Sequence, residues 1–195
     1  IMLGYPEQLE FLEVCTDDEL EAVGGREACY HEFMEAARAT CDFYIEQTPT
    51  DGVPYWDTGA PQLCQIGDYL HQPSNPFNEF EPVDSSAAAI AAQGLLRLSR
   101  LLESEEPAAS QRYFQAGLTV ANSLLQEPYL STDEEHEGLL LHSVYHRPRG
   151  WDYVADGSKM PRGESCMWGD YHLLELGLYL LRLHDDRPYY TFWGK

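Results

Sequence analysis

The segment from Asp84 to Leu101 constrains most strongly what this chain folds into. Its first residues, Asp84-Ser85-Ser86, form a strong helix start, because short polar side chains cap the free N–H groups of a first turn. Small and apolar residues then recur at spacings of three and four along one face: Ala87, Ala91, Gly94, Leu98 and Leu101. The small side chains in the first half of this helix predict close approach by another helix or by a ligand.

Other segments share this helical spacing, and no series of alternating strands runs through the chain. Helices are expected over residues 1–14, 26–47, 107–125 and 166–183. The third of these presents an apolar stripe at Phe114, Leu118, Ala121 and Leu125. The last is apolar nearly all round, which predicts burial. A brief strand is expected only at Leu139–Leu141. The sequence therefore predicts an all-α fold in which residues 1–195 form one domain.

Two long connections separate these helices. The first, 53–83, carries five prolines, a density that no helix tolerates. The second runs over 127–164. Helices joined in sequence are antiparallel by default, so both long loops fall at one end of the array and the short link at 103–106 falls at the other. Long, aromatic-rich loops gathered at one end predict the rim of a ligand site.

Composition excludes several classes of partner. Acidic residues outnumber basic ones 33 to 12, which gives a net charge of -21 and argues against nucleic acid. No apolar run reaches the length of a membrane span. The five cysteines show neither CxxC nor Cys/His spacing, so we expect free thiols, no metal site and a reducing, cytoplasmic location.

Residues 138–171 combine aromatic and cationic side chains. They hold four of the 12 Lys and Arg residues and two of the four tryptophans. Aromatic rings beside cationic groups suit a ligand with flat apolar faces and a negative charge, such as an acidic sugar. The alternative is a structured loop whose aromatic rings pack locally and whose basic groups balance acidic neighbours.

Four motifs, taken together and in order, resemble the unsaturated glucuronyl hydrolases, which are family 88 of the glycoside hydrolases. The resemblance covers nearly the whole chain. The residues that carry it are Val53-Pro54-Tyr55-Trp56-Asp57, then Asp84-Ser85-Ser86-Ala87-Ala88-Ala89-Ile90-Ala91-Ala92 with Gly94-Leu95-Leu96, then Gly138-Leu139-Leu140-Leu141-His142 with Tyr145, and Trp168-Gly169-Asp170-Tyr171 with Glu175.

The resemblance implies an (α/α)6 barrel of which this chain is roughly the C-terminal half, entered partway at Ile1. Members of the family act on the unsaturated uronic acid that polysaccharide lyases leave at a non-reducing end. An aspartic acid protonates C4 of the double bond, water adds at C5, and the hemiketal opens and releases the leaving sugar. No metal or organic cofactor is implied. The catalytic aspartate is expected upstream of Ile1, so this chain alone is expected to be inactive.

The resemblance also implies substrate contacts in the second long loop. Tyr145 matches a substrate-contacting tyrosine, with a packed core tyrosine as the alternative. His146, Arg147 and Arg149 occupy positions that vary in the family and contact the leaving sugar. An arginine there would bind a carboxylate or sulfate in a forked geometry, with a surface ion pair as the alternative.

Three further residues are candidates. Trp56 would stack on a pyranose face and Asp57 would accept hydroxyl protons, although both would equally serve to pack their loop. Trp168 begins the last helix, where a structural role is the alternative. The expected partner is an acidic oligosaccharide.

Two rival functions stay open. A related family removes unsaturated galacturonate from rhamnogalacturonan, but the Tyr-Trp-Asp and Asp-Ser-Ser-Ala motifs favour the glucuronyl hydrolases. The other rival is a non-catalytic helical module for protein interaction or sugar binding. An exposed apolar face on the first and last helices would indicate part of a barrel, whereas a polar face would indicate a stand-alone module.

Overall fold

The computed structural model describes residues 1–193 and confirms the all-α fold. Each of the expected helices is present. An additional short helix, α2, was not predicted. Leu139–Leu141 forms no strand, because only Leu140 pairs, in an isolated antiparallel bridge with Leu130. The helices are α1 (Gly4–Val14), α2 (Asp17–Glu21), α3 (Arg26–Gln47), α4 (Ser85–Leu102), α5 (Pro107–Leu124) and α6 (Met167–His184).

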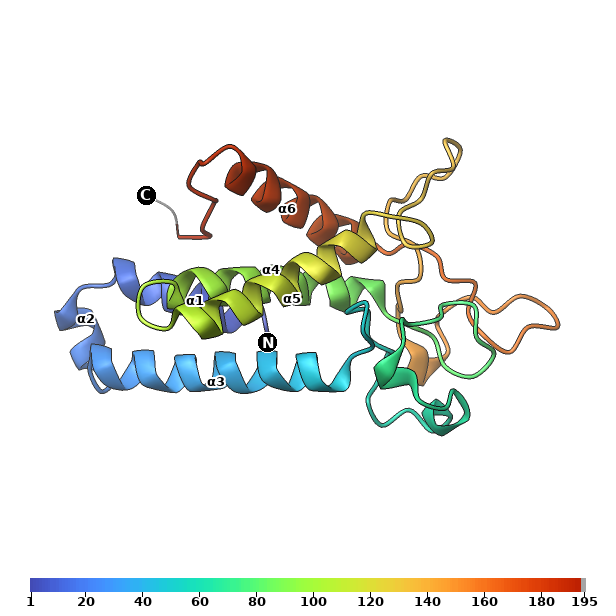
Figure 1. The fold of residues 1–195 in the computed structure, drawn as a ribbon, viewed down its shortest axis with the longest axis horizontal. Coiled ribbons are helices and arrows are strands. Elements are labelled where there is room, and N and C mark those ends of the chain that lie inside the picture. The colour runs from blue at the N-terminus through green and yellow to red at the C-terminus, as the bar shows by residue number, and fades with distance from the viewer. Residues whose placement is uncertain (194–195) are drawn as a thin grey trace.

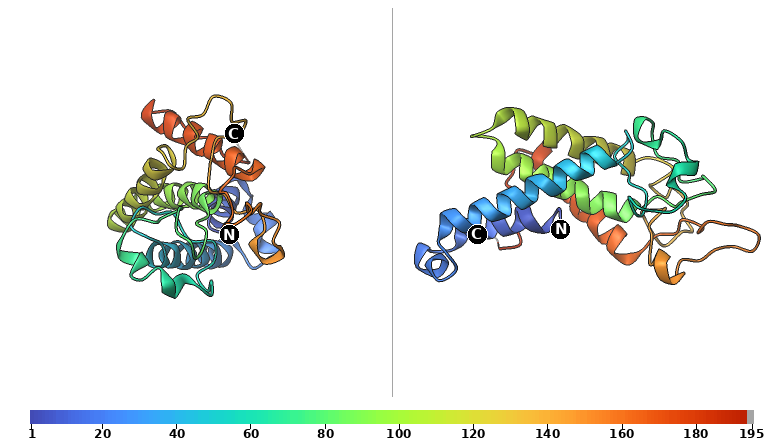
Figure 2. Two further views of the ribbon diagram at one scale, coloured as in Figure 1. Left: turned by 90° about the vertical axis from the view of Figure 1, so that its right-hand side faces the viewer. Right: turned by 90° about the horizontal axis from the view of Figure 1, so that it is seen from below.

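The four long helices alternate in direction along the chain (Figure 1). The connections 48–84 and 125–166 therefore gather at one end of the array, and the link between α4 and α5 lies at the other. Figure 2 shows the same separation from below, with α4 surrounded by the other helices. The loops thus form the end of the molecule at which the sequence predicts a site.

Helix α4 is the centre of the core. It packs against α5, α6, α1 and α3, and most of its residues are buried. Ala88, Ala92, Leu95, Leu96 and Leu98 are completely inaccessible to solvent. Neighbours approach on several sides because the N-terminal half of α4 is built largely of alanine.

The buried face of α5 agrees with the predicted stripe only in part, since Ala121 is buried as predicted. Leu118 and Leu125 are exposed, whereas Gly117, Val120 and Leu124 are buried. The reason is Gly117, where an added Cβ would lie 2.8 Å from the Leu96 side chain and 3.3 Å from the Ala92 carbonyl oxygen. Helix α5 therefore turns its glycine toward α4, and the apolar pattern is rotated away from the predicted one.

Gly94 permits an equally close approach between α4 and the N-terminal segment. A Cβ at this position would lie 2.4 Å from the carbonyl oxygen of Met2. Because that atom belongs to the backbone, Gly94→Ala must displace the start of α1, and we expect it to lower the free energy of unfolding by about 1–3 kcal/mol. Urea titration followed by circular dichroism measures the change.

Gly177 in α6 is the matched control, because an added Cβ meets no atom within 4 Å. Gly177→Ala is expected to stabilise the protein by up to about 1 kcal/mol, the helix preference of alanine over glycine. Equal effects of the two substitutions would contradict the close contact at Gly94.

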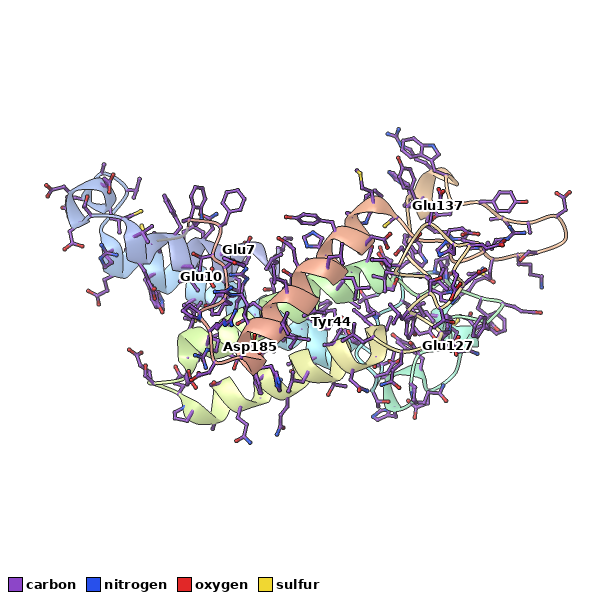
Figure 3. The ribbon with its side chains drawn as sticks, turned by 90° about the horizontal axis from the view of Figure 1, so that it is seen from above. Glu7, Glu10, Tyr44, Glu127, Glu137 and Asp185 are labelled. Atoms are coloured by element: carbon purple, nitrogen blue, oxygen red, sulfur yellow. The ribbon has the colours of Figure 1, made fainter. Side chains whose placement is uncertain are left out.

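A buried ion pair connects α1, α4 and the C-terminal segment. The Arg97 Nη1 atom lies 2.7 Å and 3.0 Å from the two carboxylate oxygens of Glu10. Tyr189 donates its hydroxyl to Glu10 at 2.9 Å, and Arg97 Nη2 donates to the Tyr190 carbonyl at 3.1 Å. Figure 3 shows Glu10 beside Glu7 on α1. The pair fixes the C-terminal segment across α1 and α4.

Helix α6 is not buried all round, contrary to the prediction. It buries Leu173, Leu176 and Tyr179 against the array, while an apolar stripe on its other side faces solvent. The stripe lacks a partner within residues 1–193 because no described helix packs on that side. Its members are Met167, Tyr171, Leu174, Leu178 and Leu181. In α1, by contrast, Leu9 and Leu12 are buried, and Val14 is the exposed large apolar residue.

None of the helices in the described part of the chain is long and apolar enough to span a membrane.

Candidate functional site

Four ring side chains at the loop end form one group, here named the aromatic cluster: Tyr145, His146, Trp151 and Trp168. The Tyr145 ring stacks on Trp168 with centroids 5.2 Å apart and an angle of 29° between the planes. Trp151 lies 5.9 Å from Tyr145, and the His146 ring meets Trp151 at 4.9 Å. Tyr145 and Trp151 are 54% and 55% exposed. Exposed rings that support one another provide an apolar surface suited to the face of a sugar.

Asp84 supports this cluster from the start of α4. Its Oδ1 atom accepts hydrogen bonds from the Ser86 hydroxyl at 2.6 Å and from the Val144 N–H at 3.3 Å, in addition to capping the helix. The Ser86 hydroxyl oxygen in turn accepts the indole N–H of Trp168 at 3.1 Å. One carboxylate oxygen therefore positions both partners of the stacked pair, Trp168 through Ser86 and Tyr145 through the preceding peptide.

Asp152 supports the same loop from the other side. Its two oxygens accept the backbone N–H groups of Tyr145 at 2.6 Å and His146 at 3.0 Å. Charge-assisted hydrogen bonds of this kind are about twice as strong as neutral ones. The backbone that carries Tyr145 is thus held between two carboxylates.

The arginines follow directly after the aromatic pair. They lie in a single 3-10 turn, Arg147–Arg149, which ends at Gly150 in the left-handed region with φ of 64°. The Arg149 guanidinium lies 5.3 Å from the centre of the Trp151 ring. The Nδ1 atom of His146 is buried without a hydrogen-bond partner in the described residues. A cationic side chain, Arg149, therefore lies directly against the aromatic cluster.

Trp56 and Asp57 lie in the other long loop. The indole N–H of Trp56 donates to the buried carboxylate of Glu81 at 2.7 Å, and Glu81 also accepts the Gln62 N–H. Asp57 accepts the Gly59 N–H at 2.6 Å within a turn. These bonds hold the loop together, and among the described residues no hydrogen bond, ion pair or ring contact joins Trp56 or Asp57 to the aromatic cluster. A role in binding substrate stays a prediction for both.

Several aspartates near the loops already accept backbone N–H groups. Asp170 accepts the N–H groups of Leu139 and Leu140 at 3.1 Å and 2.8 Å, and Asp152 accepts those of Tyr145 and His146. Burial raises the pKa of Asp84, although its four hydrogen bonds oppose that rise. Within residues 1–193 no group of His, Cys, Asp and Glu side chains has the arrangement of a metal site. The arrangement suits binding and positioning.

Two members of this arrangement were not among the predicted substrate-binding residues, namely Trp151 and Asp152. Their signal in the sequence is a Trp-Asp pair directly after the glycine that ends an Arg-Pro-Arg turn. An aspartate seven residues after Tyr145 is in reach of the backbone it stabilises only because that turn reverses the chain.

Comparison with known proteins identifies relatives of this chain. No family model matches the chain. A curated protein of Bacillus sp. (strain GL1), named unsaturated glucuronyl hydrolase, is 31% identical over 163 residues. One of the same name from Formosa agariphila is 30% identical over 146 residues. The chain is a relative of the unsaturated glucuronyl hydrolases. The matched segments are 83% and 73% of this chain but 35% and 29% of those relatives.

Solved structures of these hydrolases share the fold. The crystal structure of the enzyme from Bacillus sp. GL1 matches 99% of this chain and 39% of its own, with a TM-score of 0.66 and 25% identity. A mutant of the enzyme from Streptococcus agalactiae gives a TM-score of 0.58 over 84% of this chain, at 24% identity. The helical array therefore matches part of an (α/α)6 barrel, as predicted.

Proposed function

We propose that this chain forms one wall of the substrate site of an (α/α)6-barrel glycoside hydrolase that acts on unsaturated glucuronyl oligosaccharides. The observation that carries the proposal is the stack of Tyr145 on Trp168, held by Asp84 and Asp152 and flanked by Arg149. The rings suit the face of the leaving sugar, and the arginines suit its negative charge. Both curated relatives are named unsaturated glucuronyl hydrolase, which favours this substrate over rhamnogalacturonan.

The reaction is hydration of the C4=C5 double bond of the terminal uronic acid, which needs an acid to protonate C4. In this proposal the acid comes from barrel residues that the 195 residues do not contain. Two observations support it. Asp57, Asp152 and Asp170 are already engaged by backbone N–H groups, and the chain spans 39% of the matched barrel.

The exposed stripe on α6 supports the same proposal. Leu174 is 61% exposed and Leu181 is 56% exposed, on the side of the helix that faces no described element. Large apolar patches of this kind mark interaction surfaces. We assign residues 1–195 to the C-terminal portion of a single barrel domain in which further helices cover this stripe. The free cysteines support a reducing, cytoplasmic location.

The test is calorimetric binding of an unsaturated glucuronyl disaccharide to the 195-residue chain, with a parallel hydrolysis assay that follows loss of the double-bond absorbance. We expect binding without turnover, and at least a tenfold loss of affinity on Tyr145→Ala, about 1.4 kcal/mol. Tyr30→Ala, a half-buried tyrosine at the far end of α3, is the control and is expected to leave affinity unchanged. Clear turnover would contradict the proposal that the chain lacks the catalytic acid. Failure to bind would contradict the proposal that the chain forms one wall of the substrate site.

A further inference from the structure

We propose that a cavity beside Phe77 binds an anionic sugar residue further along the same oligosaccharide, carrying a carboxylate or a sulfate. The inference rests on the proposed function and extends it to substrate length and charge. The cavity lies between the turn at 76–79 and the loop at 157–162 and has a volume of about 410 Å³. This is within the range of small-molecule sites, roughly 300–1,000 Å³.

The charge of the cavity is opposite to that of the chain as a whole. Lys159 and Arg162 line it together with a single acid, Glu79, in a protein of net charge -21. No ion pair of the described residues involves Lys159. The Arg162 Nε atom is 3.9 Å from Glu164, and its exposed guanidinium lies over the Tyr153 ring at 5.2 Å. Both cations therefore remain able to bind an anionic group.

A neighbouring cavity of about 600 Å³ shares Phe77, His142 and Arg162 but has the opposite character. Three acids line it, namely Glu127, Asp133 and Glu164, and Figure 3 shows Glu127 at this loop end. The anionic sugar residue is accordingly assigned to the first cavity alone.

Phe77 supplies the apolar surface. Its side chain is 72% exposed, yet the turn that carries it is fixed. The Asn78 side chain donates to the carbonyls of Asn75 and Glu81 at 2.7 Å each and accepts the Phe80 and Glu81 N–H groups. An exposed aromatic ring on a rigid turn loses little conformational entropy on binding, which suits it to stack on a pyranose.

His142 forms the wall between the two cavities and is held in an unusual conformation. Its φ is 64°, in the left-handed region that non-glycine residues seldom adopt. Its N–H donates to the Gly163 carbonyl at 2.6 Å, and its carbonyl accepts the N–H of Ser85 at the start of α4. A Cβ on Gly163 would lie 2.3 Å from Nδ1 of His142, so this contact requires glycine. Strained residues fixed by their surroundings are frequent in ligand sites.

The His142 ring is suited to hydrogen bonding near neutral pH. It is half-buried and meets the Phe77 ring edge-on at 5.2 Å. Burial lowers its pKa below the ordinary value. The imidazole therefore stays uncharged near pH 7 and offers one donor and one acceptor to sugar hydroxyls, while Lys159 and Arg162 supply the charge.

The loop that carries Tyr145 of the aromatic cluster also carries residues that line the cavity. His142 precedes Tyr145 by three residues. The N–H of Ser143 donates to the backbone carbonyl of Glu164, and that of Arg162 donates to the carbonyl of Tyr153. Val154 and Pro161 form a bridge that folds the loop back on itself and returns Lys159 and Arg162 toward His142. In this proposal an oligosaccharide whose leaving sugar lies on Tyr145 continues along this loop and places a later residue in the cavity.

The test compares the wild-type chain with the variant Lys159→Ala/Arg162→Ala by calorimetry. The probes are an unsaturated glucuronyl disaccharide and three unsaturated tetrasaccharides whose internal residues are neutral, carboxylated or sulfated. We expect the variant to lose about tenfold in affinity for the charged tetrasaccharides, about 1.4 kcal/mol, and to bind the disaccharide and the neutral tetrasaccharide unchanged. The loss is expected to shrink in high salt. Whichever charged tetrasaccharide shows the larger loss identifies the group that is bound.

Two controls make the result decisive. Arg187→Ala removes an exposed cation near the C-terminus and is expected to change no affinity. Phe77→Ala is expected to weaken both charged and neutral tetrasaccharides, because stacking does not depend on charge. If all tetrasaccharides bind both chains equally while Tyr145→Ala still weakens the disaccharide, the cavity proposal is overturned and the proposed function stands. If no oligosaccharide binds the wild-type chain, both are overturned.

Discussion

Replacing Arg97 with alanine is expected to lower the free energy of unfolding by about 3–5 kcal/mol, because it leaves the buried Glu10 carboxylate without its cation. The Arg97 guanidinium also lies over the rings of Tyr179 and Tyr189, with centroids 5.6 Å and 5.3 Å away. Burial raises the pKa of the Glu10 carboxyl and Arg97 opposes that rise, so the variant loses the group that offsets the cost of the buried charge. Such a loss is a large fraction of the stability of a typical domain.

Chemical denaturation of the two chains measures this loss. Arg100→Ala is the matched control, because Arg100 lies three residues further along α4 and pairs with Glu103 at 2.8 Å on the exposed surface. Exposed pairs contribute about 0–1 kcal/mol, so a small change is expected there. In Arg97→Ala the C-terminal segment should also exchange its amide hydrogens faster, since Tyr189 and Tyr190 bond to this pair. A loss below that of Arg100→Ala would contradict the account.

The sequence predicts the long helices well because their local signals agree with their packing. Asp84 caps α4 as expected, and α3 begins and ends at Arg26 and Gln47 as predicted. Helix α2 was missed although its signal is present: Thr16 and Glu19 form a reciprocal capping box. A five-residue helix carries too few apolar positions for periodicity to reveal it.

Faces of helices were harder to predict than their positions. Apolar periodicity predicts that Leu118 and Leu125 are buried. Because Gly117 has no side chain, α5 packs closely on α4 along the face that carries this glycine instead. The apolar α6 was expected to be buried on all sides, yet which side is covered depends on what packs there. The spacing of apolar residues in a sequence shows that one face of a helix is apolar, but it does not show which element packs against that face.

The sequence names Tyr145, His146, Arg149 and Trp168 as candidates but not Trp151, and the structure shows Tyr145 stacked on Trp168 and Arg149 over Trp151. Their role in binding substrate stays a prediction. Trp56 turned toward Glu81, because a buried carboxylate needs donors and the indole N–H supplies one. The role of Asp84 for Tyr145 depends on a contact across 60 residues, which no local pattern reveals.

Asp84→Ala is therefore expected to reduce both stability and binding. The variant loses the α4 cap and leaves the Ser86 hydroxyl and the Val144 N–H without their acceptor, which together cost about 2–4 kcal/mol. Trp168 and Tyr145 then lose their common support, so affinity for the unsaturated disaccharide should fall at least tenfold at a temperature where the variant is still folded.

The substitution Asp84→Asn distinguishes the role of the Oδ1 acceptor from the role of the negative charge of the carboxylate. All four hydrogen bonds to Asp84 reach the same atom, Oδ1, at distances from 2.6 Å to 3.3 Å. An asparagine carbonyl oxygen placed there accepts the same bonds, and burial already disfavours the charge at this position, as its raised pKa indicates. We expect Asp84→Asn to retain most of the stability and affinity that Asp84→Ala loses. If the two variants fail equally, the charge of Asp84 rather than its Oδ1 acceptor is what the site needs.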